Sequence, residues 1–116
     1  MSYFVTGNVF THYVNVVSAT PVDVTPNVLG KAVLIASIEV TEISGGTPNM
    51  TIDIFDPNGA TATYYKRNAL AMTVRQNVVY PEPFWLPNGW QLRVTTSAGT
   101  VSVLVNYFDP NAASRR

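Results

Sequence analysis

The tetrapeptide Phe-Asp-Pro-Asn occurs twice, at Phe55 to Asn58 and at Phe108 to Asn111. Its carboxylate and amide oxygens are ligands that a hard cation such as Ca²⁺ accepts, so each copy has to be considered as part of a metal loop. A calcium loop needs at least about six converging oxygens, several of them from carboxylates. Around the first copy only Asp53 and Asp56 supply carboxylates. We therefore predict no metal site and interpret both copies as turns that end strands.

The same interpretation fits the other prolines, since five of the eight are followed by Asn. Proline presets the backbone for the second position of a type I turn, Asn tolerates the third, and Gly completes the fourth. Asp56 to Gly59 fits this signature fully, and Leu86 to Gly89 fits it except at the first residue. The second tetrapeptide is then a strand terminator before a polar tail at residues 110–116.

Other groups that could perform catalysis are sparse. His12 is the only histidine, and no G-x-S-x-G or comparable context marks a nucleophile. A triad or a glycosidase pair could still assemble from distant strands. Gly45-Gly46 precedes no predicted helix, so it indicates a hairpin connection and not a phosphate loop. We predict no catalytic residue, no cofactor and no enzymatic activity, with the carboxylates on turns and outer strand faces: Asp23, Glu39, Glu42, Asp53, Asp56, Glu82 and Asp109.

Composition limits the class of protein further. Charged residues make up 12% of the chain, about half the usual 25%, and the formal net charge is zero. A neutral, charge-poor surface resists self-association poorly. It indicates either a surface that other subunits cover or a Thr-rich surface that stays soluble alone. The absence of cysteine excludes a disulfide scaffold, an iron–sulfur site, a thiolate zinc site and a cysteine nucleophile.

Membrane and nucleic-acid partners are not expected. No run reaches the roughly 18 apolar residues of a membrane span, and the first residues lack the features of a signal peptide. The basic clusters Lys66-Arg67 and Arg115-Arg116 are too small for the electrostatic footprint of a nucleic-acid binder.

The elements that must position these residues are strands. Valine and threonine are abundant, and apolar residues recur with period two. The predicted fold is all-β: an antiparallel, jelly-roll-like β-sandwich of about eight strands in one domain, residues 1–116, with residues 1–20 as an N-terminal arm or first strand. The strand segments are Asn8 to Val17, Lys31 to Ile43, Asn49 to Asp56, Ala60 to Lys66, Leu70 to Tyr80, Phe84 to Leu86, Trp90 to Thr96 and Thr100 to Phe108.

Alternation also predicts which side chains face the core. In the second segment these are Leu34, Ala36, Ile38 and Val40. In the fifth they are Leu70, Met72, Val74 and Val78.

The segment Tyr80 to Trp90 is aromatic and holds three prolines, so it cannot be a central strand. With Trp90 directed inward, Trp85 is free to cap the sandwich, to anchor a protein interface or to stack on a sugar with Tyr64 or Tyr65. The apolar N-terminal residues also need a surface to cover them. The candidate interface residues are therefore Tyr3, Phe4, Val5, Phe84 and Trp85.

The stretch Leu86 to Asp109, LPNGWQLRVTTSAGTVSVLVNYFD, resembles a widespread type of small virion protein of tailed bacteriophages. Such proteins share an apolar strand, a Gly-containing break, a DxxG turn, a Leu-x-x-Gly turn, a short strand, a Ser-Ala-Gly hairpin and a closing Val strand. The matching pieces are Ile38 to Thr41, Gly45-Gly46, Asp56 to Gly59, Leu86 to Gly89, Leu92 to Val94, Ser97 to Gly99 and Val101 to Val105. Trp90 departs from the pattern, since members often carry an acidic residue there.

The resemblance covers about residues 30 to 109 and implies a capsid decoration (cement) subunit. It would act on the capsid surface of the virion after assembly in the host cytoplasm, with copies of itself, as a homotrimer, and the major capsid protein or another virion protein as partners. The alternative is a carbohydrate- or receptor-binding module of a tail or fibre.

Overall fold

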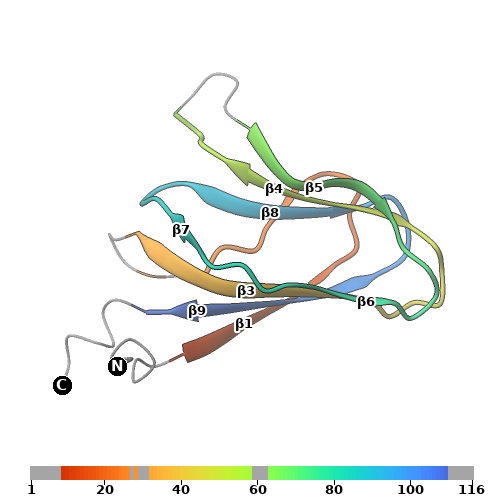
Figure 1. Ribbon diagram of the computed structural model, residues 1–116. Coiled ribbons are helices and arrows are strands. Elements are labelled where there is room, and N and C mark those ends of the chain that lie inside the picture. The colour runs from red at the N-terminus through yellow and green to blue at the C-terminus, as the bar shows by residue number, and fades with distance from the viewer. Residues whose placement is uncertain (1–8, 27, 29–31, 59–62, 110–116) are drawn as a thin grey trace.

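The computed structural model describes residues 9–26, 28, 32–58 and 63–109, of which residues 63–66 are described by their backbone only (Figure 1). This part of the chain contains nine strands and no helix. The strands form two antiparallel sheets that pack face to face (Figure 1). The predicted all-β sandwich is therefore confirmed.

Sheet A has the order β1-β9-β3-β6, with β7 also paired to β3. Its strands are β1 (Val9–Val16), β9 (Val101–Phe108), β3 (Val33–Glu42), β6 (Asn77–Tyr80) and β7 (Phe84–Leu86). Because β9 occupies one side of β3, the short β6 and β7 share the other side, as two parts of one interrupted strand.

Sheet B has the order β2-β8-β4-β5. Its strands are β2 (Val22–Asp23), β8 (Gln91–Thr96), β4 (Asn49–Phe55) and β5 (Thr63–Ala71). With β6 and β7 counted as one, each sheet has four strands, which is the jelly-roll-like arrangement that the sequence predicted.

Three strand predictions were wrong in detail. The segment predicted at Ala60 to Lys66 lies too early in the sequence, since β5 runs over Thr63–Ala71. The segment Leu70 to Tyr80 is not one strand: β5 ends at Ala71, a turn follows, and β6 begins at Asn77. In this turn the Gln76 amide donates to the Thr73 carbonyl, 3.1 Å away, and Val74, predicted to face the core, is 54% exposed. The sequence also gave no indication of the two-residue β2.

The core lies between the sheets. Its buried apolar residues are Val16, Val24, Val33, Ile35, Ile38, Val40, Met50, Ile52, Met72, Leu86, Leu92, Val94, Val101, Val103 and Val105. In β3 the pairing with β9 shifts between Ile35 and Ser37, and such a bulge reverses which residues face the core. Ile38 and Val40 are buried as predicted, but Val33 and Ile35 replace Leu34 and Ala36.

The first Phe-Asp-Pro-Asn copy is a turn, as predicted. The Asn58 amide donates to the Asp56 carboxylate at 2.9 Å, so this carboxylate stabilises its own turn. The proline turn before β8 starts one residue later than predicted, because the Trp90 amide donates to the Pro87 carbonyl at 3.1 Å. Gly89 then occupies the third turn position with φ of 88°, a conformation that glycine adopts readily.

Candidate functional site

The face of sheet A that points away from sheet B carries rows of aligned side chains. Successive residues of a strand face opposite sides of its sheet, and the core takes the other set. One row, aligned by the strand pairing, is apolar across the sheet and consists of Val9, Phe108, Leu34 and Trp85. A second row consists of Tyr13, Leu104, Glu39 and Val79.

Hydrogen-bonded polar side chains separate these rows. The Thr11 hydroxyl donates to the Asn106 side-chain oxygen at 2.6 Å, and the Asn106 amide donates to the Ser37 hydroxyl at 2.9 Å. Beyond the second row, the Asn77 amide donates to the Thr41 hydroxyl at 2.6 Å. These polar groups bond to one another across strands, so they order the face without needing a partner.

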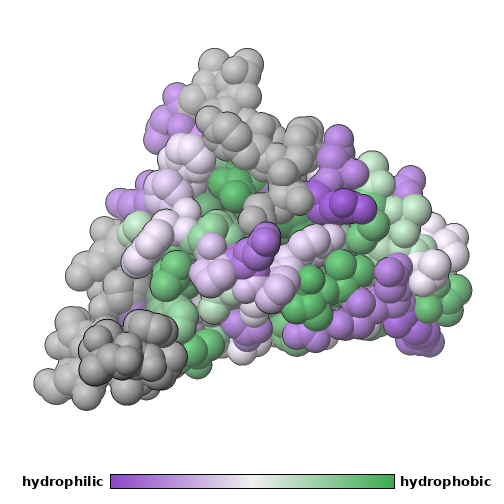
Figure 2. Space-filling view, in the orientation of Figure 1, coloured by the Kyte–Doolittle hydropathy of each residue, from purple (hydrophilic) through white to green (hydrophobic). Residues whose placement is uncertain are grey.

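We call the seven apolar residues of the two rows the apolar face. Four of its members are strongly exposed: Val9 is 54%, Tyr13 55%, Val79 49% and Trp85 64% exposed. They make up most of the large exposed hydrophobic residues in the described part of the chain. Figure 2, in the orientation of Figure 1, shows hydrophobic residues interspersed with hydrophilic ones over the side of the molecule in view. The first row is apolar across four strands, and exposed apolar surface of this kind usually marks an interaction site.

The structure separates the candidate interface residues. Trp85 belongs to the apolar face, whereas Phe84 is half-buried and packs against the core. Tyr3, Phe4 and Val5 lie outside the described residues. Tyr64 and Tyr65 belong to β5 of sheet B, and Trp85 points away from that sheet, so the backbone does not join these three aromatics in one stacking platform.

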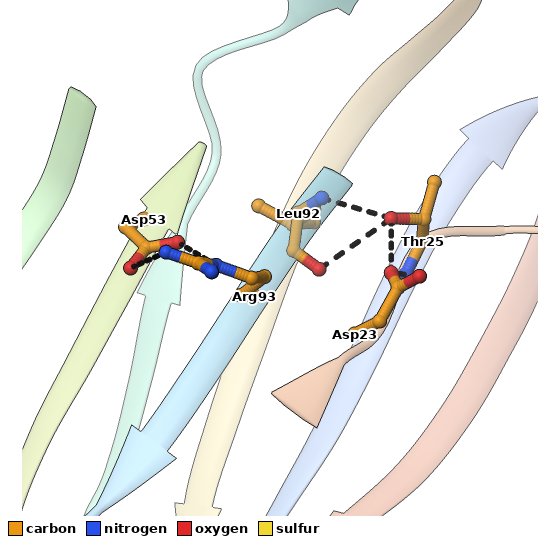
Figure 3. Close-up of polar contacts among 5 residues, drawn as sticks. All are labelled: Asp23, Thr25, Asp53, Leu92 and Arg93. Atoms are coloured by element: carbon orange, nitrogen blue, oxygen red, sulfur yellow. Dashed lines mark hydrogen bonds and ion pairs between the residues drawn. The ribbon is translucent and has the colours of Figure 1, made fainter. Parts of the chain in front are cut away.

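The outer face of sheet B is organised around an ion pair (Figure 3). The Arg93 guanidinium donates to both oxygens of the Asp53 carboxylate, at 2.8 and 3.1 Å. The guanidinium also lies over the Phe55 ring, 4.1 Å from its centre. Only 6% of the Asp53 side chain is exposed. This carboxylate is therefore paired within the protein and is not presented to a ligand.

A second carboxylate nearby has a local structural role (Figure 3). The Asp23 carboxylate accepts hydrogen bonds from the amide and the hydroxyl of Thr25. The Leu92 amide in turn donates to the Thr25 hydroxyl at 2.8 Å. Among the described residues, no three acidic or histidine side chains cluster so that they could hold a metal ion.

Glu42 was predicted on an outer face, but it is fully buried. Its carboxylate accepts hydrogen bonds from the Ser44 hydroxyl at 2.5 Å and from the amides of Ser44, Gly45, Gly46 and Arg75. These bonds, that of the Ser44 hydroxyl above all, lower the pKa of Glu42 from 4.5 to about 2, against the opposing effect of burial. The Gly45-Gly46 loop therefore surrounds an internal anion, and a carboxylate two residues before Ser-Gly-Gly was the available signal.

Two further candidates for chemistry are the histidine and a surface cleft. His12 is half-buried on the inward side of β1, opposite Val105 of β9. A shallow cleft of about 440 Å³ lies between the segment after β2 and the turn before β8. Its polar lining comes from Asp23, Thr25, Asn88 and Gln91, and Trp90 contributes an aromatic wall.

No helix capable of spanning a bilayer occurs in the described part of the chain.

Among solved structures, this chain resembles a chain of the cyanophage Pam1 capsid asymmetric unit, with a TM-score of 0.51 and 19% sequence identity. The match covers 90% of this chain and 86% of the cyanophage chain. At this identity the likeness supports a shared fold. No protein-family model and no curated protein sequence matches the chain.

Proposed function

We propose that this protein is a structural, non-enzymatic subunit of a bacteriophage virion, and specifically a capsid decoration (cement) protein. The observation that carries the proposal is the apolar face of sheet A on a fold that matches a phage capsid chain over most of its length. The low charged fraction supports it, because a neutral surface is suited to contact with other subunits.

The mechanism is burial of surface between subunits. A stable interface covers roughly 800 Å² of each partner, and exposed aromatic residues contribute most of the binding energy at such interfaces. Trp85, at 64% exposure, is the proposed anchor, and the aligned Leu34, Phe108 and Val9 extend the row from it across the sheet. Many identical sites on a shell add avidity, so each contact can be weak and the shell still be stabilised.

The proposed partners are the major capsid protein, or another virion protein, and further copies of this chain, for which the sequence resemblance implies a homotrimer. The proposed location is the outer surface of the capsid, reached during assembly in the host cytoplasm. Neither a nucleic acid nor a membrane is a proposed partner.

The test is binding of the purified protein to expanded capsids of its phage, measured by co-sedimentation. Trp85→Ala should weaken binding about 30-fold, which corresponds to about 2 kcal/mol for a central aromatic anchor. Val74→Ala is the matched control, because Val74 is also exposed, at 54%, but lies in the turn between β5 and β6. Failure of the unmodified protein to bind capsids, or equal binding by both variants, would contradict the proposal.

A glycan-binding module is the second candidate, favoured by the cleft beside Trp90. Its amide and carboxylate groups and its aromatic wall are the kinds of group that hydrogen-bond and stack on sugars. A glycan array tests this function, with Gln91→Ala as the cleft variant and Trp85→Ala as a variant of the apolar face. Sugar binding that either variant abolishes would support it, and an empty array would count against it.

A further inference from the structure

We propose that β1 is an assembly edge, on which β1 of a second copy of this chain pairs antiparallel about a two-fold axis. The proposal concerns the isolated protein and does not depend on a role in a virion. It starts from the general behaviour of sheet edges, where unpaired amide and carbonyl groups can pair with another strand unless the edge is protected.

Three of the four edges of the sandwich carry protection. The β6 and β7 edge is interrupted, and Pro81 and Pro83 between the two strands have no amide to donate. The β2 edge has only two residues. The β5 edge is irregular, because its pairing with β4 shifts register at two places, and it also carries Arg67 and the left-handed Ala69, with φ of 54°.

The β1 edge has none of these features. It runs for eight residues, and all eight pair with β9 without a register shift. In the described residues β9 is its only partner strand. Its sequence, VFTHYVNV, contains no proline, glycine, lysine, arginine, aspartate or glutamate. A strand without formal charge can approach an identical strand without repulsion between like charges.

The side chains of β1 also fit a second copy. Phe10 faces inward and packs near the Tyr107 ring, with 5.9 Å between ring centres, yet it is 37% exposed. On the other side Tyr13 is 55% exposed. In an antiparallel pair the residues directly opposite each other lie on the same side of the sheet. Phe10 and Val14 would therefore meet the inward residues of the second β1, and Thr11 and Tyr13 would meet its outward residues.

Such pairing joins the A sheets of two copies into one continuous sheet, which is a known mode of strand addition. It is isologous, so it predicts an even number of copies. The result is a dimer, or a hexamer where the trimer implied by the resemblance also forms. The apolar faces of both copies then lie on one side of the joint sheet and can engage a common surface.

The first measurement is light scattering on the purified protein, where a mass of two or six chains is expected. Thr11→Lys should halve that mass by placing charge in the middle of the paired edge, while Val74→Lys should leave it unchanged. Circular dichroism checks that both variants are folded. Trp85→Ala should keep the mass of the unmodified protein, which separates this contact from the capsid-binding face.

Cross-linking through introduced cysteines is an independent test, because the chain has no cysteine of its own that could form a competing disulfide. Under mild oxidation at least one of Thr11→Cys and Tyr13→Cys should form a covalent dimer, and Val74→Cys should not. A variant lacking residues 1–8 should remain dimeric.

Three results would overturn the proposal. The first is a protein that is monomeric or trimeric at every soluble concentration. The second is a dimer that Thr11→Lys does not disrupt and that neither edge cysteine links. The third is a full chain that is monomeric while the variant lacking residues 1–8 dimerises, since the edge would then be covered by the chain's own N-terminal segment.

Discussion

Two glycines in left-handed conformations test how hydrogen bonds to Glu42 and Ser44 stabilise the Gly45-Gly46 loop. Gly45 has φ of 89° and Gly99 has φ of 65°. A Cβ atom added at Gly45 meets nothing within 4 Å, whereas one added at Gly99 would lie 2.3 Å from the Ser44 hydroxyl oxygen. Alanine at either position is strained by its backbone, but only Gly99→Ala also collides with a neighbour.

The Ser44 hydroxyl cannot move away freely. It donates to the Glu42 carboxylate at 2.5 Å and accepts from the Thr100 amide at 3.1 Å. A left-handed backbone destabilises alanine by about 1–2 kcal/mol relative to glycine. Alanine also lowers the conformational entropy of the unfolded chain, which stabilises the folded state by roughly 0.4–1 kcal/mol. Gly45→Ala should therefore lose about 1 kcal/mol of unfolding free energy. Gly99→Ala should lose about 3 kcal/mol, because two hydrogen bonds of about 1 kcal/mol each are also broken.

Urea unfolding followed by tryptophan fluorescence measures both losses. The double variant Ser44→Ala/Gly99→Ala completes a cycle: with the hydroxyl removed, alanine at position 99 should cost about as much as at position 45, roughly 1 kcal/mol. Equal losses for Gly45→Ala and Gly99→Ala would refute the reasoning, as would a Gly99→Ala penalty that persists unchanged without the Ser44 hydroxyl.

Three other perturbations have definite expected outcomes. Arg93→Met leaves the Asp53 carboxylate buried without its guanidinium and should cost about 3 kcal/mol in denaturant unfolding; a loss below about 1 kcal/mol, typical of a surface pair, would contradict this. Glu42 has a folded pKa of about 2 against an ordinary 4.5, so the unfolded state binds more protons between these values. The stability that Glu42 contributes is complete above about pH 4.5 and falls as the pH approaches 2, and melting curves of Glu42→Gln should show a weaker acid dependence than the unmodified protein; identical slopes would contradict the assignment. Asp56→Ala removes the acceptor of the Asn58 amide and should cost about 1 kcal/mol, while added calcium should not change the melting temperature of the unmodified protein; a rise would restore the metal-loop hypothesis.

Local alternation was sufficient to predict most of the sheet elements. The bounds of β7 were predicted without error, and those of β1, β3, β4, β8 and β9 to within two residues at each end. Most of these segments alternate apolar and polar residues, and each has Pro, Gly or Asn within three residues of at least one end, so their period and many of their limits are encoded nearby.

The errors arose where distant residues decide local structure. The turn before β6 has neither glycine nor proline, and the left-handed Arg75, with φ of 59°, donates its amide to Glu42, which lies 33 positions earlier. The bulge in β3 likewise depends on how β9 pairs with it. No window of sequence around either site contains its cause.

The apolar face could likewise be predicted only in part from the sequence. Trp85 could be selected from sequence because an aromatic residue between prolines has an unusual setting. Its neighbours could not, because Leu34, Phe108 and Val9 come from three other strands. Only the register of four strands brings these residues into one row, and register depends on the whole sheet.

The position of β9 in sheet A has a consequence for biosynthesis. Among the described strands, β9 comes last in the sequence yet lies between β1 and β3, so neither the β1–β9 pairing nor the β9–β3 pairing can form until β9 has been synthesised. Contacts between such distant segments slow folding, and a nascent chain exposes unpaired strands while it waits for them. Chains truncated before β9 should therefore leave β1 and β3 without the strand that pairs with both of them and should aggregate.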